Sequence, residues 1–302
     1  MPLRINQNGD ITGRYIGFSG GPHGFVRLAN GYLVEFDEPA FIETFPQGMN
    51  SYGQIVGYGG VSLGIDGFLR NPNGKFVRIH IPGFIATIPN AINDGGAIAG
   101  TYYANTGPSH GFLRDASGDY SLFDEPDAGR SANQGTWATA INASGVIAGY
   151  YSDEGSVYHG FIRDGSGNFT SFDALDAGTQ VNTGTQPYAI NAAGEIAGVL
   201  FDDTGSTHAF VRDSAGNITT FDGPDAIYTA TTSINDSGLI LGVWQPGNIA
   251  QGFLRDAEGN FTSFSVPVPK VYTSPESINN NGRMTGWYGE RSGQAHGFVA
   301  TF

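Results

Sequence analysis

Residues 136–173 read TWATAINASGVIAGYYSDEGSVYHGFIRDGSGNFTSFD, and this stretch contains four short apolar runs. A turn from Asn142 to Gly145 separates the first two runs, a polar loop follows the second, and a turn from Gly165 to Asn168 separates the last two. Gly, Asn, Asp and Ser between alternating apolar residues are typical of tight turns between strands. The stretch therefore predicts four antiparallel strands of about the usual five or six residues each.

The same phrase recurs along the whole chain of 302 residues. Its turn begins each time with an Asn, at Asn6, Asn50, Asn93, Asn142, Asn191, Asn235 and Asn279. The spacings that follow from these numbers are 44, 43, 49, 49, 44 and 44 residues, which indicates a repeat architecture. Four antiparallel strands at this period match the blade of a β-propeller. We predict an all-β fold, one domain over residues 1–302, which is a seven-bladed β-propeller of four-stranded blades with repeats starting near residues 3, 47, 90, 139, 188, 232 and 276.

The last repeat contains only three predicted strands, between Ser277 and Phe302. Either the last blade has three strands, or an additional N-terminal segment of the native protein completes it. In the first case the outer edge of residues 296–302 has unpaired backbone groups, which makes it a site for pairing with other strands. We expect this edge to be exposed to solvent or engaged in a contact.

Composition excludes several classes of partner. The formal net charge is −14, with Lys and Arg numbering 14, which argues against binding nucleic acid or anionic lipid. No apolar stretch reaches the roughly 20 residues of a membrane span, and the first repeat begins at once without a leader. Because the chain has no Cys, it can form neither disulfides nor Cys-ligated metal sites. We expect a monomer that needs no cofactor.

A recurring His invites a metal hypothesis. It precedes the Gly-Phe or Ala-Phe pair of the third run at His23, His110, His159, His208 and His296. A ring would spread these side chains around its rim, whereas metal ligands must converge on one point at about 2 Å. We therefore predict no metal site and interpret each His as a polar group that ties the third strand to a neighbouring loop. The Arg that recurs two residues after the Phe is also interpreted as structural: we expect it to form a salt bridge between blades or a hydrogen bond to a loop carbonyl.

The phrase His208-Ala209-Phe210, its His-Gly-Phe variants, and the unit Ile141–Tyr150 together resemble the bacterial extracellular HAF-type repeat. The resemblance covers nearly the full chain, although Arg stands where that repeat often has Trp. It implies a propeller-like scaffold in a secreted or surface protein, and therefore an extracellular or periplasmic location. It implies no established activity and no catalytic residues.

The topology of a propeller predicts which face carries the function. The tight turns after the first and third strands of each repeat must lie on one face of the ring. The connections that vary in length, after the second and fourth strands, then lie on the opposite face. Since loops on a rigid scaffold are where binding and catalysis concentrate, we predict a central pocket on that opposite face.

Two sets of residues would line this pocket. In six of the seven first strands a polar residue precedes the Ile or Met by two positions: Gln47, Asn90, Thr139, Tyr188, Thr232 and Glu276. Aromatic residues follow the Gly of the second strand or lie near the same rim: Tyr15, Tyr58, Tyr102, Tyr150, Trp137, Trp244 and Trp287. Aromatic rings among amides and charges are typical of sugar-binding sites. We predict that the aromatic set, with Gln47, Asn90 and Arg130, binds a small polar molecule or a carbohydrate; packing of the aromatics between blades is the alternative.

The second hypothesis is an enzyme that acts on sugars through the same pocket. Glu276 and Glu43 are the candidate acid and base, Tyr188 is a candidate proton donor, and Arg14 could neutralise a carboxylate. Two acids across a pocket could hydrolyse a glycoside. A Tyr with an Arg could instead carry out β-elimination on a uronic acid, as a lyase does. The third hypothesis is a protein-interaction platform, which a flat and filled face would favour.

Overall fold

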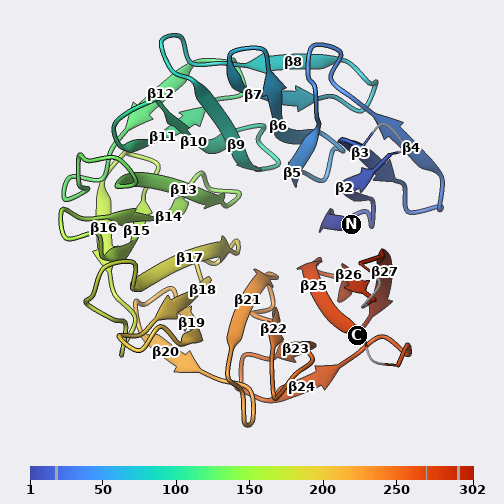
Figure 1. The fold of residues 1–302 in the computed structure, drawn as a ribbon, viewed down its shortest axis with the longest axis vertical. Coiled ribbons are helices and arrows are strands. Elements are labelled where there is room, and N and C mark those ends of the chain that lie inside the picture. The colour runs from blue at the N-terminus through green and yellow to red at the C-terminus, as the bar shows by residue number, and fades with distance from the viewer. Residues whose placement is uncertain (18–19, 270, 291–292) are drawn as a thin grey trace.

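The computed structural model describes residues 1–17, 20–269, 271–290 and 293–302 as β-strands and turns around a central axis (Figure 1). The first strands are β1 (Pro2–Ile5), β2 (Ile11–Ile16), β3 (Pro22–Arg27), β4 (Leu33–Phe36), β5 (Phe45–Met49), β6 (Ile55–Val61), β7 (Gly64–Arg70), β8 (Phe76–Ile79), β9 (Ala86–Ile92), β10 (Ile98–Tyr103), β11 (Ser109–Arg114) and β12 (Tyr120–Phe123). The next are β13 (Gly135–Ile141), β14 (Ile147–Ser152), β15 (Tyr158–Arg163), β16 (Phe169–Phe172), β17 (Gly184–Ile190), β18 (Ile196–Phe201), β19 (Thr207–Arg212) and β20 (Ile218–Phe221). The last are β21 (Thr229–Ile234), β22 (Ile240–Trp244), β23 (Gln251–Arg255), β24 (Phe261–Phe264), β25 (Tyr272–Ile278), β26 (Arg283–Gly289) and β27 (Ala295–Thr301).

Strands that follow one another in sequence pair antiparallel into meanders, and the first strand of each meander lies nearest the axis (Figure 1). Strands β1 to β4, β21 to β24 and β25 to β27 form separate sheets. Strands β5 to β20 form one continuous sheet because single parallel bridges join its meanders, at Ile65–Ala86, Ser109–Gly135 and Tyr158–Gly184. The prediction of an all-β ring of antiparallel sheets is confirmed. Among the described residues, no helix is long and apolar enough to span a membrane.

The recurring Gly of the second strand and Phe of the third strand pack against each other. In β14 a Cβ on Gly149 would lie 2.7 Å from Cζ of Phe161, so no other residue fits beneath the ring. The equivalent Phe side chains Phe68, Phe112, Phe161, Phe210 and Phe253 are fully buried. Burying an aromatic ring in each of these five meanders contributes about 2–3 kcal/mol per ring. The Gly of the second strand and the Phe of the Gly-Phe pair therefore recur together because they pack against each other.

The recurring Asn side chains connect the meanders to one another. In each turn the Asn Oδ1 accepts main-chain N–H groups of its own turn, as Asn142 does from Ser144 at 3.1 Å and Val146 at 3.0 Å. Its Nδ2 donates to the carbonyl oxygen of the next Asn along the chain. These bonds join Asn6 to Asn50, Asn50 to Asn93, Asn93 to Asn142, Asn142 to Asn191, Asn191 to Asn235, Asn235 to Asn279, and Asn279 back to Asn6. The sequence predicted the tight turn at each Asn, but it did not reveal this closed circle.

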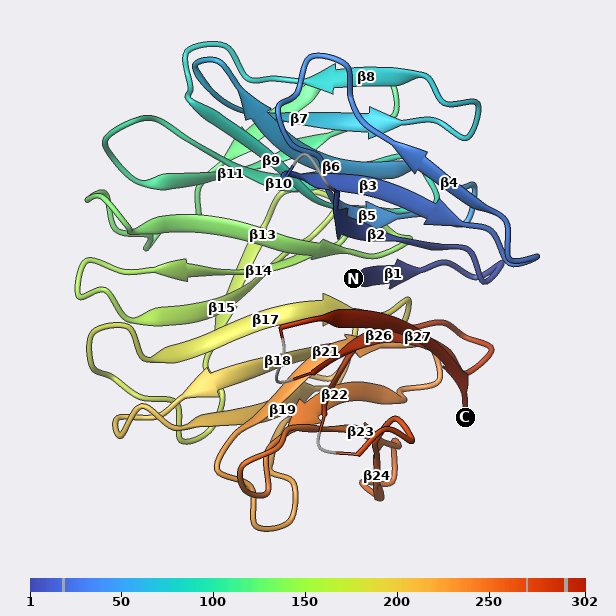
Figure 2. The ribbon, with the colours of Figure 1, turned by 45° about the vertical axis from the view of Figure 1, so that its right-hand side comes forward.

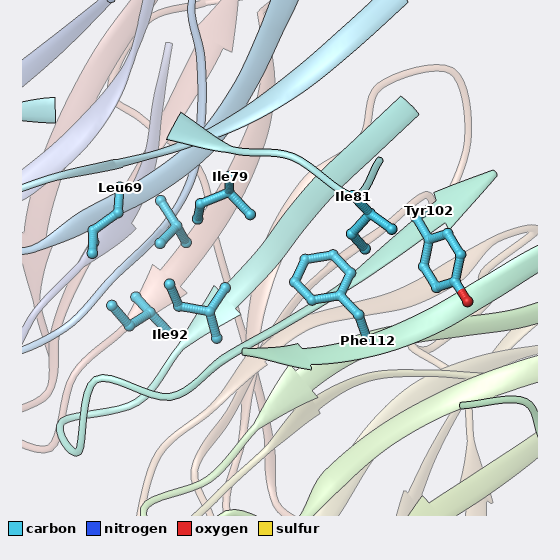
Figure 3. Close-up of a cluster of buried hydrophobic side chains, with 8 residues drawn as sticks. Leu69, Ile79, Ile81, Ile92, Tyr102 and Phe112 are labelled. Carbon is cyan, nitrogen blue, oxygen red and sulfur yellow. The ribbon is translucent and has the colours of Figure 1, made fainter. Parts of the chain in front are cut away.

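Each hydrophobic cluster lies between neighbouring meanders. Figure 3 shows one of them, in which Leu69 and Ile79 meet Ile92 and Phe112 of the following strands. Tyr102 belongs to the same cluster and is 6% exposed. Stability therefore arises from contacts between neighbours, as expected for a repeat architecture.

The recurring His pairs with an Asp that follows the fourth strand, 14 residues later. Nδ1 of His110 lies 2.7 Å from Asp124 Oδ1, and His23, His159 and His208 form the same pair with Asp37, Asp173 and Asp222. In the second meander the two residues are exchanged: Asp66 occupies the His position, and His80 bonds to it at 2.7 Å. The interpretation of these His as structural ties between strand and loop is confirmed.

Candidate functional site

Every innermost strand contains an irregularity at the same position. The pairing register between first and second strands skips one residue in each meander: Leu3, Gln47, Asn90, Thr139, Tyr188, Thr232 and Glu276. A β-bulge of this kind turns a side chain away from the regular alternation of the strand. Six of these seven residues line a central cavity of about 510 Å³; in β1 the cavity is lined by Arg4 in place of Leu3. The polar positions identified in the sequence are therefore bulges aimed at the axis.

One wall of the central cavity is aromatic. The indole of Trp137 stacks on the ring of Tyr150, with centroids 5.1 Å apart and planes inclined by 18°. Tyr158 packs edge-on against both rings, and Tyr188 and Tyr228 continue the wall. The hydroxyl of Tyr188 donates to Gln186 Oε1 at 2.6 Å. Burial raises the pKa of Tyr188 to about 12 and also raises the pKa of Tyr150, so both phenols stay neutral hydrogen-bonding groups at physiological pH.

A charged region lies across the axis from this wall, where β25 meets β1 (Figure 1). Glu276 Oε1 accepts the indole N–H of Trp287 at 2.8 Å and the hydroxyl of Ser274 at 3.1 Å. Burial raises the pKa of Glu276, and the bond from Trp287 and the nearby charge of Arg4 oppose that rise. Burial also lowers the pKa of the Arg4 guanidinium, while the charge of Glu276 opposes that change. The cavity thus combines one cation and one carboxylate with a broad aromatic surface.

The cavity brings together eight of the residues predicted from the sequence: Glu276, Tyr188, Trp137, Tyr150, Gln47, Asn90, Thr139 and Thr232. Trp287 reaches the site through its bond to Glu276. Asn90 also donates to the carbonyl oxygen of Ala138 at 2.8 Å, so part of its bonding capacity is used within the scaffold. A second cavity of about 710 Å³ shares Trp137 and continues outward past Tyr158 and Tyr103.

Other predicted residues do not line the central cavity. Trp244 is 7% exposed and packs edge-on against Phe261 in a hydrophobic cluster, and Tyr102 is buried among Phe84, Phe112 and His110. Tyr15 stacks near His23 at the junction of the first and last sheets. For Trp244 and Tyr102, packing within the scaffold is the correct interpretation, whereas Tyr15 lines a separate groove at that junction.

The remaining four predicted residues also lie elsewhere. Tyr58 stacks on Phe45, with centroids 5.0 Å apart, and the Arg14 guanidinium lies 5.3 Å from the centre of the same ring. Arg14 is still close enough to act on the pKa of Glu276. Glu43 lies in the loop before β5, beside Gly21, and Arg130 is exposed in the loop before β13. The predicted pair of acids, Glu276 and Glu43, does not meet in the central cavity.

Strand alternation explains which aromatics reach the site. The first residue after the second-strand Gly faces the innermost strand, as Tyr150 faces Trp137 and Trp287 faces Glu276. The second residue after that Gly faces a neighbouring sheet or the recurring His; examples are Tyr15, Tyr102, Tyr151, Trp244 and Tyr288. Because side chains of a strand point to opposite faces in turn, these two positions should have been separated in the sequence.

Six cavity residues were missed: Arg4, Tyr228, Ala230, Thr231, Val243 and Ser274. A signal for Arg4 does exist in the sequence. The residue directly before the Ile or Met is small in the other six repeats: Gly48, Ala91, Ala140, Ala189, Ser233 and Ser277. Arg4 is the exception at this position, and of these seven residues it is the one that lines the central cavity.

The described residues contain no group of three or more His, Asp or Glu side chains placed to hold a metal ion. No protein-family model matches the chain, and no curated protein matches it in sequence. Solved structures are similar in shape. They include the BP39L lectin from Burkholderia pseudomallei, at 8% identity over 99% of this chain and 95% of that chain with a TM-score of 0.63.

A streptogramin B lyase matches at 13% identity over 99% of this chain and 93% of that chain, with a TM-score of 0.60. The β-propeller domain of the Trilobed protease from Pyrococcus furiosus matches at 8% identity over 99% and 94%, with a TM-score of 0.66. At such low identity these similarities concern shape alone. The chain therefore has the β-propeller fold.

Proposed function

We propose that this protein binds a carbohydrate, as a small polar ligand, in the central cavity. The observation that carries the proposal is the stacked pair Trp137 and Tyr150 facing hydrogen-bonding side chains across one cavity. Sugars present C–H faces that stack on aromatic rings, and hydroxyl groups that bond to amides, carboxylates and guanidinium groups. Gln47, Asn90 and Glu276 supply such groups from three different bulges. The second cavity, which shares Trp137, would accept further units of an oligosaccharide.

We also propose that the ring consists of seven blades in one domain, six with four strands and the last with three. The closed circle of Asn hydrogen bonds supports this count, because each Asn belongs to the first turn of one blade. From the resemblance to the HAF-type repeat we further propose that the protein acts outside the cytoplasm. Fractionation of cells that produce the native protein tests this location.

The binding proposal is tested by soaking crystals in mixed oligosaccharides and by calorimetric titration of the sugars that bind. Electron density in the central cavity, stacked on Trp137, is expected. Replacing Trp137 by Ala should weaken binding about tenfold or more, because the stacking surface is lost. Density confined to the outer rim between blades would contradict the central site.

A second candidate function is a lyase that acts on a sugar through the same residues. It is favoured by the meeting of Glu276, Arg4 and the neutral Tyr188 in one cavity; burial raises the pKa of Glu276, which is the direction that a general acid requires. Hydrolysis by two carboxylates is less well supported, because Glu276 is the one carboxylate among the described residues that line the cavity. The structural neighbours include a lectin and a lyase, so the fold does not distinguish binding from catalysis. Release of unsaturated uronate products, lost in Glu276→Gln, would identify a lyase.

A further inference from the structure

Neighbouring sheets share an interaction built from three recurring residues. Gly160 of β15 pairs with Phe172 of β16, and the Phe172 ring covers the Gly so closely that a Cβ there would lie 2.7 Å from it. The Cζ of Arg212 in the following meander lies 5.2 Å from the centre of the same ring. The ring therefore contacts both a Gly of its own meander and a cation of the next.

The same arrangement recurs around the ring. Arg70 lies over Phe36, Arg163 over Phe123 and Arg255 over Phe221, each pair joining a third strand to the fourth strand of the preceding meander. The fourth strand β8 ends in Ile79 where the others end in Phe, and Arg114 of the next meander lies over Tyr120 of its own meander instead. Where the preceding meander offers a Phe, the Arg of the sequence phrase therefore packs on it.

At the junction of the last and first sheets the Gly and the Arg are present without an aromatic ring between them; the smaller ring of Pro2 lies against Gly297 instead, where a Cβ would be 2.7 Å from its Cγ. Gly297 of β27 and Arg27 of β3 both line a groove of about 420 Å³, together with Phe25, Phe298, Val299 and Leu33. Nη1 of Arg27 is buried and has no hydrogen-bond partner among the described residues. We name these six residues the junction groove.

The sheet edge beside the junction groove is unpaired. Among the described residues β27 pairs with β26 alone, whereas each of the other third strands also pairs with a fourth strand. Figure 2 shows β27 facing β1 across the junction. Val299 at this edge is 39% exposed. An unpaired edge presents a row of N–H and C=O groups that can accept another strand.

His296 indicates which residue would follow the Phe in a strand bound at this edge. It occupies the position at which His110, His159 and His208 bond to the Asp that follows a fourth strand. In the last sheet its Nε2 lies 3.6 Å from Glu290, and no described fourth strand brings an Asp to it. A strand that ends in Phe-Asp would therefore place an aromatic ring beside Arg27 and a hydrogen-bonding carboxylate beside His296.

We propose that the junction groove binds an extended peptide strand of a partner protein, with the pattern aromatic-x-x-Phe-Asp. The strand would add antiparallel to β27 in the register of β15 and β16, which places its second aromatic residue opposite Gly297 and its first opposite Ala300. Main-chain hydrogen bonds supply affinity, and the Phe between Gly297 and Arg27 supplies specificity. This inference does not depend on the central cavity or its ligand.

A labelled peptide with the sequence GNFTSFDAL, that of residues 167–175, is a suitable probe, titrated against the full chain and followed by fluorescence anisotropy. Saturable binding is expected, weakened about tenfold or more when the second Phe of the peptide becomes Ala, and less when its Asp becomes Asn. Gly297→Val should abolish binding by filling the ring site. Arg27→Gln, which keeps the backbone unchanged, should weaken it severalfold.

Arg163→Gln is the matched control, since Arg163 already covers Phe123 and should leave peptide affinity unchanged. Absence of saturable binding would overturn the proposal, as would equal affinity for the peptide that lacks its second Phe. A dimer in sedimentation experiments that the peptide does not dissociate would assign the groove to a second copy of the chain, and would also overturn it.

Discussion

Asn279 donates its side-chain N–H to the carbonyl oxygen of Asn6 at 2.9 Å, and so joins the last sheet to the first across 273 positions of sequence. The main-chain N–H of Ile5 adds a bond to Ser277 Oγ at 3.3 Å at the same junction. Both Asn side chains are buried, which makes an unmet polar group there costly. Ring closure therefore rests on the same bond that connects every other pair of neighbours.

The first prediction concerns this closure. Asn279→Asp keeps the acceptor for the N–H groups of Asn281 and Arg283 but replaces the donor to Asn6 by an oxygen. We expect the free energy of unfolding to fall by about 2–4 kcal/mol, because a buried charge then faces a carbonyl oxygen. Urea denaturation measures the change. Asn281→Asp, the same substitution at an exposed neighbour, should change stability by less than about 1 kcal/mol; an equal effect of both would refute the interpretation.

The second prediction separates two Trp residues by role. Trp137→Ala should weaken carbohydrate binding about tenfold or more while leaving the unfolding transition nearly unchanged, because the indole faces the cavity. Trp244→Ala should lower the free energy of unfolding by about 3–5 kcal/mol, because this side chain fills a hydrophobic cluster. Calorimetric titration and urea denaturation of both variants provide the comparison. If Trp244→Ala abolishes binding while the free energy of unfolding stays unchanged, the assignment of the two residues is wrong.

The third prediction concerns Glu276. Trp287→Phe removes the N–H donor that stabilises the carboxylate, so the pKa of Glu276, already raised by burial, should rise further. A folded-state pKa above the ordinary value of 4.5 means that stability falls as pH rises through it, and this loss should move to higher pH in the variant. Carboxyl chemical shifts followed by NMR measure the pKa. Trp137→Phe is the control, for which no change at Glu276 is expected.

The fourth prediction concerns His159. Its bond to Asp173 raises the pKa of the imidazole above its ordinary value of 6.5, against the opposing effect of burial. The stabilisation from this pair is therefore complete below pH 6.5 and is lost as pH rises through the raised pKa. Asp173→Asn should lower the pKa of His159, as measured by NMR titration of the ring protons. Glu154→Gln removes the same charge from an exposed neighbouring residue, and an equally large shift there would argue against the specific pair.

Strand number and order within each repeat could be predicted because turns and alternation are local. Gly145, for example, has φ of 80°, which the Asn-x-x-Gly phrase requires. The aromatic site could be predicted only in part. Tyr150 and Tyr151 are adjacent in sequence, yet one stacks on Trp137 and the other on His159. The prediction treated the first and second residues after the second-strand Gly as equivalent. It therefore assigned Tyr15, Tyr102 and Trp244 to the site, although the alternation of the strand directs all three away from it.

The sequence by itself determined the strands, the tight turns and the pairing of Gly with Phe, because these depend on neighbours within one repeat. Only the tertiary structure decided which residues of different repeats meet. The circle of Asn bonds, the approach of Arg4 to Glu276, and the Gly297–Arg27 groove all join residues from different repeats. Each repeat supplies one copy of a recurring residue, so the sequence does not show which residues of other repeats it contacts. Closure of the ring brings these residues together.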